Sequence, residues 1–334
     1  MALTSGSDNV VIGSYAGDNL DAGTYNVAIG RSALSNEDAH GYNVAVGAFA
    51  LLNQDAGADA HNVAVGYNSG ASVTTGIQNT LVGGLAGDGL IIDKDNVVVG
   101  YQSLSAAHAG SRNTAIGKGT LTAQQTTTQV TGGAYADSGD ATITHDTSTK
   151  PQVGQLVTSD KAGIPSGATV LSVTDDTHFE LSANTTSAQT GAIITLAGNV
   201  DAYNTAVGFQ AGNDITTGIN NTLMGGLAGD AITTGLDNTI LGYNSGSSMT
   251  TGGYNILVGS LAGDALVSGD NNVVLGYNAM SSADGSESRN VAIGSNTLAA
   301  MNSNDWNYNV AVGYNAGTAV TTGTLNTLIG GQAG

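Results

Sequence analysis

A short apolar run between an asparagine and a glycine recurs along most of the chain at a nearly constant interval. Each run fits the pattern N-[VTI]-apolar-[VILM]-G-x-x-[AST]-[GLM], and its Asn is counted here as position 0. Successive Asn residues are 17 to 19 residues apart, except for one interval of 91 residues. A fixed short period predicts stacked coils rather than a globular catalytic domain. The residues at position 0 are Asn9, Asn26, Asn43, Asn62, Asn79, Asn96, Asn113, Asn204, Asn221, Asn238, Asn255, Asn272, Asn290, Asn309 and Asn326.

The apolar run predicts a short β-strand in every coil. Position 1 is always Val, Thr or Ile, and β-branched residues favour strands. Runs of consecutive apolar residues, such as Val27 to Ile29, indicate a strand that is covered on both faces. The coil interior covers one face, and another copy of the chain is expected to cover the other. The invariant Gly at position 4 ends the strand, because only Gly turns there without steric cost.

Two further positions complete the predicted coil. Position 7 is always Ala, Ser or Thr, which indicates a tightly packed place. Position 11 is often apolar, as in Leu20, Leu90 and Ile232, and predicts a second inward-facing strand. Each coil should then contain two strands and two turns. The predicted fold class is all-β, a parallel β-roll or β-solenoid of about 17-residue coils, trimeric and with an inserted small β domain.

Equivalent side chains of stacked coils lie above one another in columns. Asn carries donors and an acceptor, so the Asn column is predicted to form a hydrogen-bonded ladder, with a row of ion or ligand sites as the alternative. At position 5, Tyr67, Gly84 and Tyr101 show an alternation that repeats every 34 residues. We expect these rings to pack over the Gly of the neighbouring coil, with a sugar-binding row as the alternative.

The pattern is lost between Asn113 and Asn204, in a segment that holds both prolines. Because the period resumes unchanged, the segment is predicted to be a small all-β domain inserted in a loop. The expected organisation is seven coils in 1–122, the inserted domain in 123–199 and eight coils in 200–334. The β-like runs within the insertion are 141–144, 155–158, 169–173, 178–181 and 192–196.

Composition and charge exclude several function classes. The net charge is −19, from 7 basic and 26 acidic residues, so the basic footprint of a nucleic-acid-binding protein is lacking. There is no Cys, which excludes a disulfide scaffold and thiolate metal sites. No apolar run approaches the roughly 20 residues of a membrane-spanning helix. Residues 1–6 lack the charged and apolar regions of a signal peptide. We therefore expect neither nucleic-acid binding nor membrane insertion.

Because the sequence lacks recognisable catalytic motifs, we predict that the protein is not an enzyme. The five His residues show no metal-ligand pairing, and neither HExxH, G-x-S-x-G nor a P-loop is present. Acidic turns such as Asp93 with Asp95 are interpreted as solvated carboxylates rather than calcium sites. No catalytic residue, cofactor or metal ligand is predicted. A pair of carboxylates assembled between chains, as in some polysaccharide-cleaving spikes, is the enzymatic alternative.

Three parts of the sequence resemble known families. The repeats Asn26 to Gly30, Asn43 to Gly47 and Asn309 to Gly313 resemble the head repeats of trimeric autotransporter adhesins, which are parallel β-rolls of three chains side by side. Asn309 to Gly317, followed by Thr321 to Asn326, resembles the shaft repeats of phage tail fibres more closely. In the insertion, Gly163 to Val170 resembles short β modules of phage tail proteins. The resemblance implies a homotrimer.

Together these observations predict a structural fibre or adhesin of a phage virion, located in the tail fibre. It would attach to a host cell-surface glycan or protein without covalent chemistry and would contact other virion tail proteins. The alternatives are a bacterial surface trimeric adhesin and a tailspike-type polysaccharide depolymerase. If this part of the fibre binds a receptor, the aperiodic insertion is expected to do so, unless it only braces the fibre. Its candidate receptor-binding residues are Tyr135, Lys150, Lys161 and His178.

Overall fold

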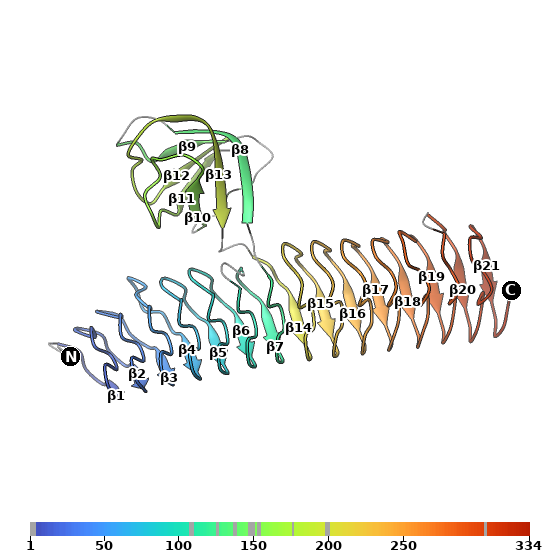
Figure 1. Ribbon diagram of the computed structural model, residues 1–334, viewed down its shortest axis with the longest axis horizontal. Helices are drawn as coiled ribbons and strands as arrows, with labels where there is room; N and C mark the ends of the chain where they lie inside the picture. The colour runs from blue at the N-terminus through green and yellow to red at the C-terminus, as the bar shows by residue number, and fades with distance from the viewer. Residues whose placement is uncertain are drawn as a thin grey trace.

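The computed structural model shows two β-sheets of different kinds (Figure 1). It describes residues 5–106, 110–124, 127–135, 139–145, 151, 155–175, 177–197, 201–303 and 306–334. These residues form strands and turns and contain no helix, so the fold is all-β as predicted. In this described part of the chain, nothing qualifies as a helix long and apolar enough to cross a membrane.

The first sheet is the shaft, a parallel β-solenoid built from the coils on either side of the insertion (Figure 1). Its fifteen strands follow one another in chain order, and neighbours pair in register, as Val27 does with Val44. The predicted solenoid of about 17-residue coils is therefore confirmed. The strands are β1 (Val10–Ile12), β2 (Val27–Ile29), β3 (Val44–Val46), β4 (Val63–Val65), β5 (Thr80–Val82), β6 (Val97–Val99), β7 (Thr114–Ile116), β14 (Thr205–Val207), β15 (Thr222–Met224), β16 (Thr239–Leu241), β17 (Ile256–Val258), β18 (Val273–Leu275), β19 (Val291–Ile293), β20 (Val310–Val312) and β21 (Thr327–Ile329).

Within each strand the middle residue points into the coil and its two neighbours point outward. In β2, for example, Ala28 is buried while Val27 and Ile29 are partly exposed. The buried residues at position 2 join those at positions 7 and 11, such as Ala33 and Leu90, in one apolar core that runs along the shaft. The prediction that position 7 is tightly packed is correct. Because many core residues are Ala, each coil contributes little apolar area and depends on its neighbours.

The predicted second strand of each coil is wrong. Position 11 does point inward, since Leu20 and Leu90 are fully buried, but this half of the described coils is built of turns. Positions 6 and 8 adopt left-handed backbone conformations, with φ of 57° at Leu85 and 51° at Leu34, and such residues interrupt an extended strand. Backbone hydrogen bonds still join successive coils here, for example from the Gly17 N–H to the Ala33 carbonyl.

The invariant Gly at position 4 is required where successive coils touch. Gly242 has a φ of 143°, a conformation that disfavours other residues. A β-carbon on Gly242 would also lie closer than any normal contact to the carbonyl oxygen of Gly259 in the next coil. The prediction that only Gly turns at this position without steric cost is therefore correct.

The Asn column forms a continuous chain of hydrogen bonds along the shaft. The side-chain oxygen of each Asn accepts the backbone N–H of the next Asn at 2.8 to 3.3 Å, including the step from Asn113 to Asn204. In most coils the amide nitrogen donates to the carbonyl of position 14, as Asn238 does to Gly252 at 2.8 Å. These bonds satisfy polar groups that the coil buries, as buried polar groups require.

The second sheet is formed within the insertion and is antiparallel (Figure 1). Its strand order is β10-β13-β8-β9-β12-β11, and its own core is built around Phe179, Ile143 and Leu181. The strands are β8 (Thr127–Tyr135), β9 (Thr142–Thr144), β10 (Leu156–Ser159), β11 (Val170–Asp175), β12 (His178–Leu181) and β13 (Gln189–Ala197).

The shaft continues past the insertion without a break. β7 pairs directly with β14, in the register that places Thr114 opposite Thr205. The backbone N–H of Ala123 donates to the Asn213 carbonyl, so the coil before the insertion is complete to that point. The second sheet accordingly stands beside the shaft near the junction of β7 and β14 (Figure 1).

Candidate functional site

The largest candidate site is the outward side of the shaft sheet, which we call the outer face. It consists of the residues at positions −1, 1, 3 and 5, which alternate along the strand with inward residues. Its strand residues leave apolar area in contact with solvent, with Met224 46% and Ile256 43% exposed. Most of the large exposed apolar residues lie on this face: Val10, Ile12, Tyr25, Tyr42, Val65, Tyr67, Val97, Val99, Tyr101, Ile116, Tyr203, Phe209, Met224, Tyr243, Tyr254, Ile256, Tyr277, Ile293, Tyr308, Tyr314, Leu325 and Ile329.

One border of the outer face is an aromatic and cationic column at position −1. The rings of Tyr25 and Tyr42 stack at 5.2 Å, and Tyr42 stacks on His61 at 4.9 Å. Further along, the guanidinium group of Arg112 lies 5.7 Å from the Tyr203 ring centroid. The sequence interpretation overlooked this column, because it read each repeat forward from Asn. The signal was present, since Tyr precedes the Asn in several coils.

The other border is the Tyr column at position 5. A β-carbon placed on Gly84 would lie 3.5 Å from the ring of Tyr101, and one on Gly226 would lie 3.6 Å from the ring of Tyr243. The prediction that these rings pack over the Gly of the neighbouring coil is therefore correct. Tyr243 nevertheless remains 62% exposed, so the same rings can contact a partner.

A hollow of about 290 Å³ opens where the insertion leaves the shaft. At position 6 of three successive coils stand Gln102, Gly119 and Gln210, all with a left-handed backbone. Because Gly119 has no side chain, space remains between the two Gln residues. The hollow is lined by Gln102, Ser105, Lys118, Gly119, Thr122, Phe209, Gln210 and Asn213. Amides, hydroxyls, one ammonium group and one aromatic ring can bind a small polar ligand here.

The proposed receptor-binding residues of the insertion have local partners where they are described. The Lys161 ammonium group donates to the Thr190 carbonyl, which ties the residues after β10 to β13. The Nδ1 atom of His178 lies 2.9 Å from the Asp175 carboxylate. This contact, followed by the backbone and hydroxyl of Thr177, holds the pKa of Asp175 well below its usual range. Lys161 and His178 thus lie at different turns: Lys161 is oriented by β13, and His178 by the turn between β11 and β12.

The other two candidate receptor-binding residues, Tyr135 and Lys150, are described only in part or not at all. The backbone of Tyr135 ends β8, but its side chain lies outside the described residues, as does all of Lys150. Loop residues Ser166 and Gly167 border a hollow of about 680 Å³ together with Thr74 and Ile91 of the shaft. This part of the inserted sheet therefore faces the turns of the shaft.

One group of described residues has the composition of a metal site. The ligand atoms of Glu37, Asp38 and His40 lie within 4.8 Å of one another. The sequence search missed this group because it tested for paired His residues.

Comparison with known proteins does not identify a family, so the function must be inferred from the architecture. No protein-family model matches the chain, and neither does any curated protein. A β-solenoid of this form is compatible with a fibre, an adhesin or a tailspike.

Proposed function

We propose that the protein is a trimeric, non-enzymatic fibre or adhesin of a phage virion that attaches to a host cell-surface glycan or protein. The observation that carries this proposal is the apolar outer face, which runs the length of the shaft without a covering layer in the single chain. The resemblance to phage tail-fibre shafts and to trimeric adhesin heads supports the number of copies and the setting.

The outer face supports side-by-side assembly of identical shafts. Soluble monomers rarely expose contiguous apolar patches larger than a few hundred Å². Burial of apolar surface contributes roughly 25 cal/mol per Å², so a face that repeats in every coil gains stability with each coil. Parallel copies around a common axis place the same position of each chain at the same height, as cyclic symmetry requires.

Recognition is assigned to the aperiodic parts of the protein. The hollow at Gly119 and the inserted sheet each occur once per chain, whereas the outer face repeats. In a trimer each would be presented three times on one rigid body. Three weak contacts to a cell surface then act together, because the second and third binding events occur at high effective concentration. The net charge of −19 favours a partner other than nucleic acid or an anionic lipid surface.

The assembly is tested by native mass measurement of the full chain at micromolar concentration. The wild-type protein should have three times the chain mass. In the double variant M224E/I256E the charges fall on the outer face, and the assembly should dissociate into folded monomers. The control L171E/V173E carries the same charges on exposed apolar residues of β11 and should remain trimeric. A monomeric wild-type protein would remove the basis of the proposal.

Binding and catalysis are separated by a second experiment. The assembled protein is incubated with capsule polysaccharide from a bacterium to which it binds, and new reducing ends are measured. The proposal requires binding without new ends. Release of reducing ends would instead support the depolymerase alternative, and binding to proteins of animal or plant cells but not to bacteria would support a bacterial surface adhesin.

A further inference from the structure

Glu37 places a carboxylate where the preceding coil places an apolar side chain and the following coil places the amide of Gln54. It occupies position 11, which holds Leu20 in the preceding coil, and it is fully buried. Its Oε1 atom accepts the backbone N–H of His40 at 3.0 Å. Its Oε2 atom is buried and has no hydrogen-bond partner among the described residues. A buried carboxylate with one unsatisfied oxygen is costly unless it binds a proton or a cation.

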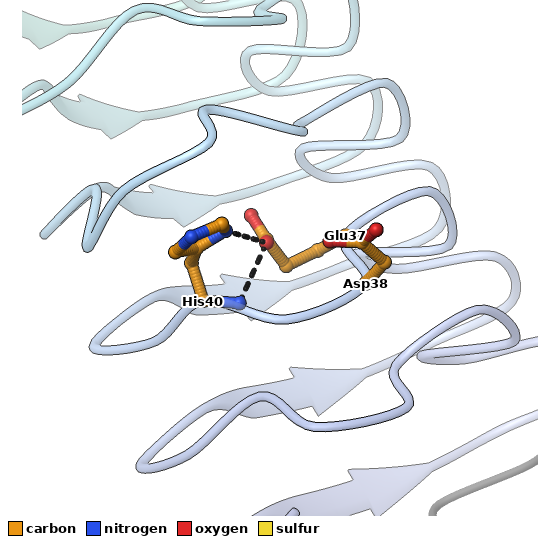
Figure 2. Close-up of side chains that lie close together, drawn as sticks. All are labelled: Glu37, Asp38 and His40. Carbon is orange, nitrogen blue, oxygen red and sulfur yellow. Dashed lines mark hydrogen bonds and ion pairs between the residues drawn. The ribbon is translucent and has the colours of Figure 1, made fainter.

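The imidazole of His40 faces this carboxylate (Figure 2). Its Nδ1 atom lies 3.5 Å from Oε1 of Glu37, and that buried Nδ1 atom also has no hydrogen-bond partner in the described part of the chain. The distance is long for a hydrogen bond, which favours about 2.9 Å. Two atoms bound to one tetrahedral ion, each at about 2.1 Å, are separated by about 3.4 Å. The spacing therefore suits two ligands of a shared ion.

Asp38 supplies a third ligand on a turn that is already fixed. The three ligand atoms lie within 4.8 Å of one another. The Asp38 carbonyl accepts the backbone N–H groups of Asp21 and Ala22, at 2.8 and 2.9 Å. The His40 carbonyl accepts the side-chain amide of Asn26 at 2.9 Å. Both ends of the turn are held by other parts of the stack, so an ion would meet a preorganised site.

The electrostatic surroundings favour a cation. The carboxylates of Asp38 and Asp55 act on the Glu37 carboxylate together with the single imidazole of His40. Three carboxylates, those of Glu37, Asp38 and Asp55, thus lie near a single potentially cationic side chain, His40. A divalent cation would neutralise this excess and satisfy the buried oxygen at once.

We propose that Glu37, Asp38 and His40 bind one divalent transition-metal ion per chain. Imidazole nitrogen together with carboxylate oxygen suits Zn²⁺ and similar ions, whereas Ca²⁺ and Mg²⁺ prefer oxygen ligands alone. The ion would link the turn of this coil to its buried position 11 and stabilise the N-terminal part of the shaft. The site does not depend on the proposed attachment function, and its test uses no receptor.

The repeat itself supplies variants that should fold. Glu37→Leu introduces the residue that position 11 has in Leu20, and His40→Gly introduces the residue that position 14 has in Gly23 and Gly76. Glu287→Gln is the control, because Glu287 is also fully buried but both its oxygens accept backbone N–H groups, from Gly285 and Ser303. Gln loses one of these two acceptors, so the starting Tm of this variant falls while its response to Zn²⁺ is unchanged.

The experiment uses the full chain without an affinity tag, first stripped by a chelator and then titrated with ZnCl₂. Equilibrium dialysis should give one Zn²⁺ per chain for the wild type and E287Q, with a rise in Tm of several degrees. E37L and H40G should lose both effects. In chelator, E37L should melt above the wild type, because it removes an unsatisfied buried carboxylate.

Three results would overturn the proposal. The first is a wild-type protein whose Tm does not respond to Zn²⁺. The second is an undiminished response in both E37L and H40G, which would place the ion elsewhere. The third is tighter binding of Ca²⁺ than of Zn²⁺, which would contradict the ligand chemistry assigned to His40.

Discussion

The side-chain oxygen of Asn221 accepts two hydrogen bonds from Asn238, one from its backbone N–H at 3.2 Å and one from its Nδ2 atom at 3.0 Å. The side-chain oxygen of Asn238 in turn accepts the backbone N–H of Asn255 at 3.0 Å. Each ladder residue therefore satisfies groups in both neighbouring coils, and removing one side chain affects three coils.

The first prediction concerns this ladder. Asn238→Leu should lower the free energy of unfolding by at least about 1–3 kcal/mol, since it leaves buried donors and acceptors unpaired. Asn19→Leu, at an exposed turn, should change it little. Thermal and denaturant unfolding measure both variants. Equal stabilities would show that the ladder bonds contribute nothing net.

The second prediction concerns the coil contact at position 4. Gly242→Ala should destabilise the shaft by about 3 kcal/mol or more, because it adds both backbone strain and a clash with the Gly259 carbonyl. Gly331→Ala is the control, since a β-carbon added there would lie 3.8 Å from the nearest atom, the carbonyl oxygen of Tyr314. Denaturant midpoints compare the two, and a mild effect at Gly242 would mean that coils can separate slightly.

The third prediction concerns the hollow. Gly119→Asn fills it with the residue that position 6 carries at Asn68 and Asn244, where φ is 54° and 56°, so the shaft should fold normally. Binding of oligosaccharides from a recognised host polysaccharide should weaken at least about tenfold, equivalent to about 1.4 kcal/mol. Titration calorimetry measures the affinity. Asn68→Gln, in the same column but away from the hollow, should bind normally; unchanged affinity of G119N would exclude the hollow as a binding site.

The fourth prediction separates the inserted sheet from the shaft. Joining Gln124 to Asn199 restores a 17-residue interval between Asn113 and Asn204, whose strands already pair in register. The shortened chain should assemble as the wild type does. Host-cell binding should fall sharply if the insertion carries recognition. Normal binding by an assembled deletion variant would instead leave recognition to the shaft.

The fifth prediction concerns pH. Burial raises the pKa values of Asp88, Asp230 and Asp264 above the ordinary Asp value. A raised folded-state pKa means that these groups favour folding when protonated, and that this contribution is lost as pH rises through the folded-state pKa. The triple Asn variant, which copies Asn213 at the same position 9, should be more stable at pH 7 and should lose part of the wild-type pH dependence between pH 4 and neutrality. A series of unfolding curves over this range tests the sign.

The repetitive part of the fold could be predicted because its constraints are local and recur. The Gly at position 4 and the small residues at position 7 each report a close contact directly. The second strand was wrongly predicted because Leu34 and Leu85 adopt left-handed conformations, and Leu gives no sequence signal for that state. In the insertion, the five predicted runs correspond to β9 through β13, whereas β8 was missed because it contains Gly132 and Gly133 and only one aliphatic β-branched residue, Val130.

The candidate sites were harder to predict because they arise from differences between coils. Gly119 creates a hollow only because its neighbours in the column have side chains. In the sequence, Glu37 is one departure among others from the apolar residues at position 11, and its proximity to His40 depends on the path of one turn. A repeat consensus does not show residues that depart from it, such as Gly119 and Glu37. The structure shows which side chains lie beside each of them.

Because every coil pairs in register with the next, the length of the shaft is set by the number of repeats that the gene encodes. Recombination between two repeats adds or removes a whole coil while the junction residues still match. Each such event would change the reach of the protein by about 4.8 Å, the spacing of neighbouring strands, without requiring a new core. Length can therefore evolve independently of recognition, in steps finer than any change of domain would allow.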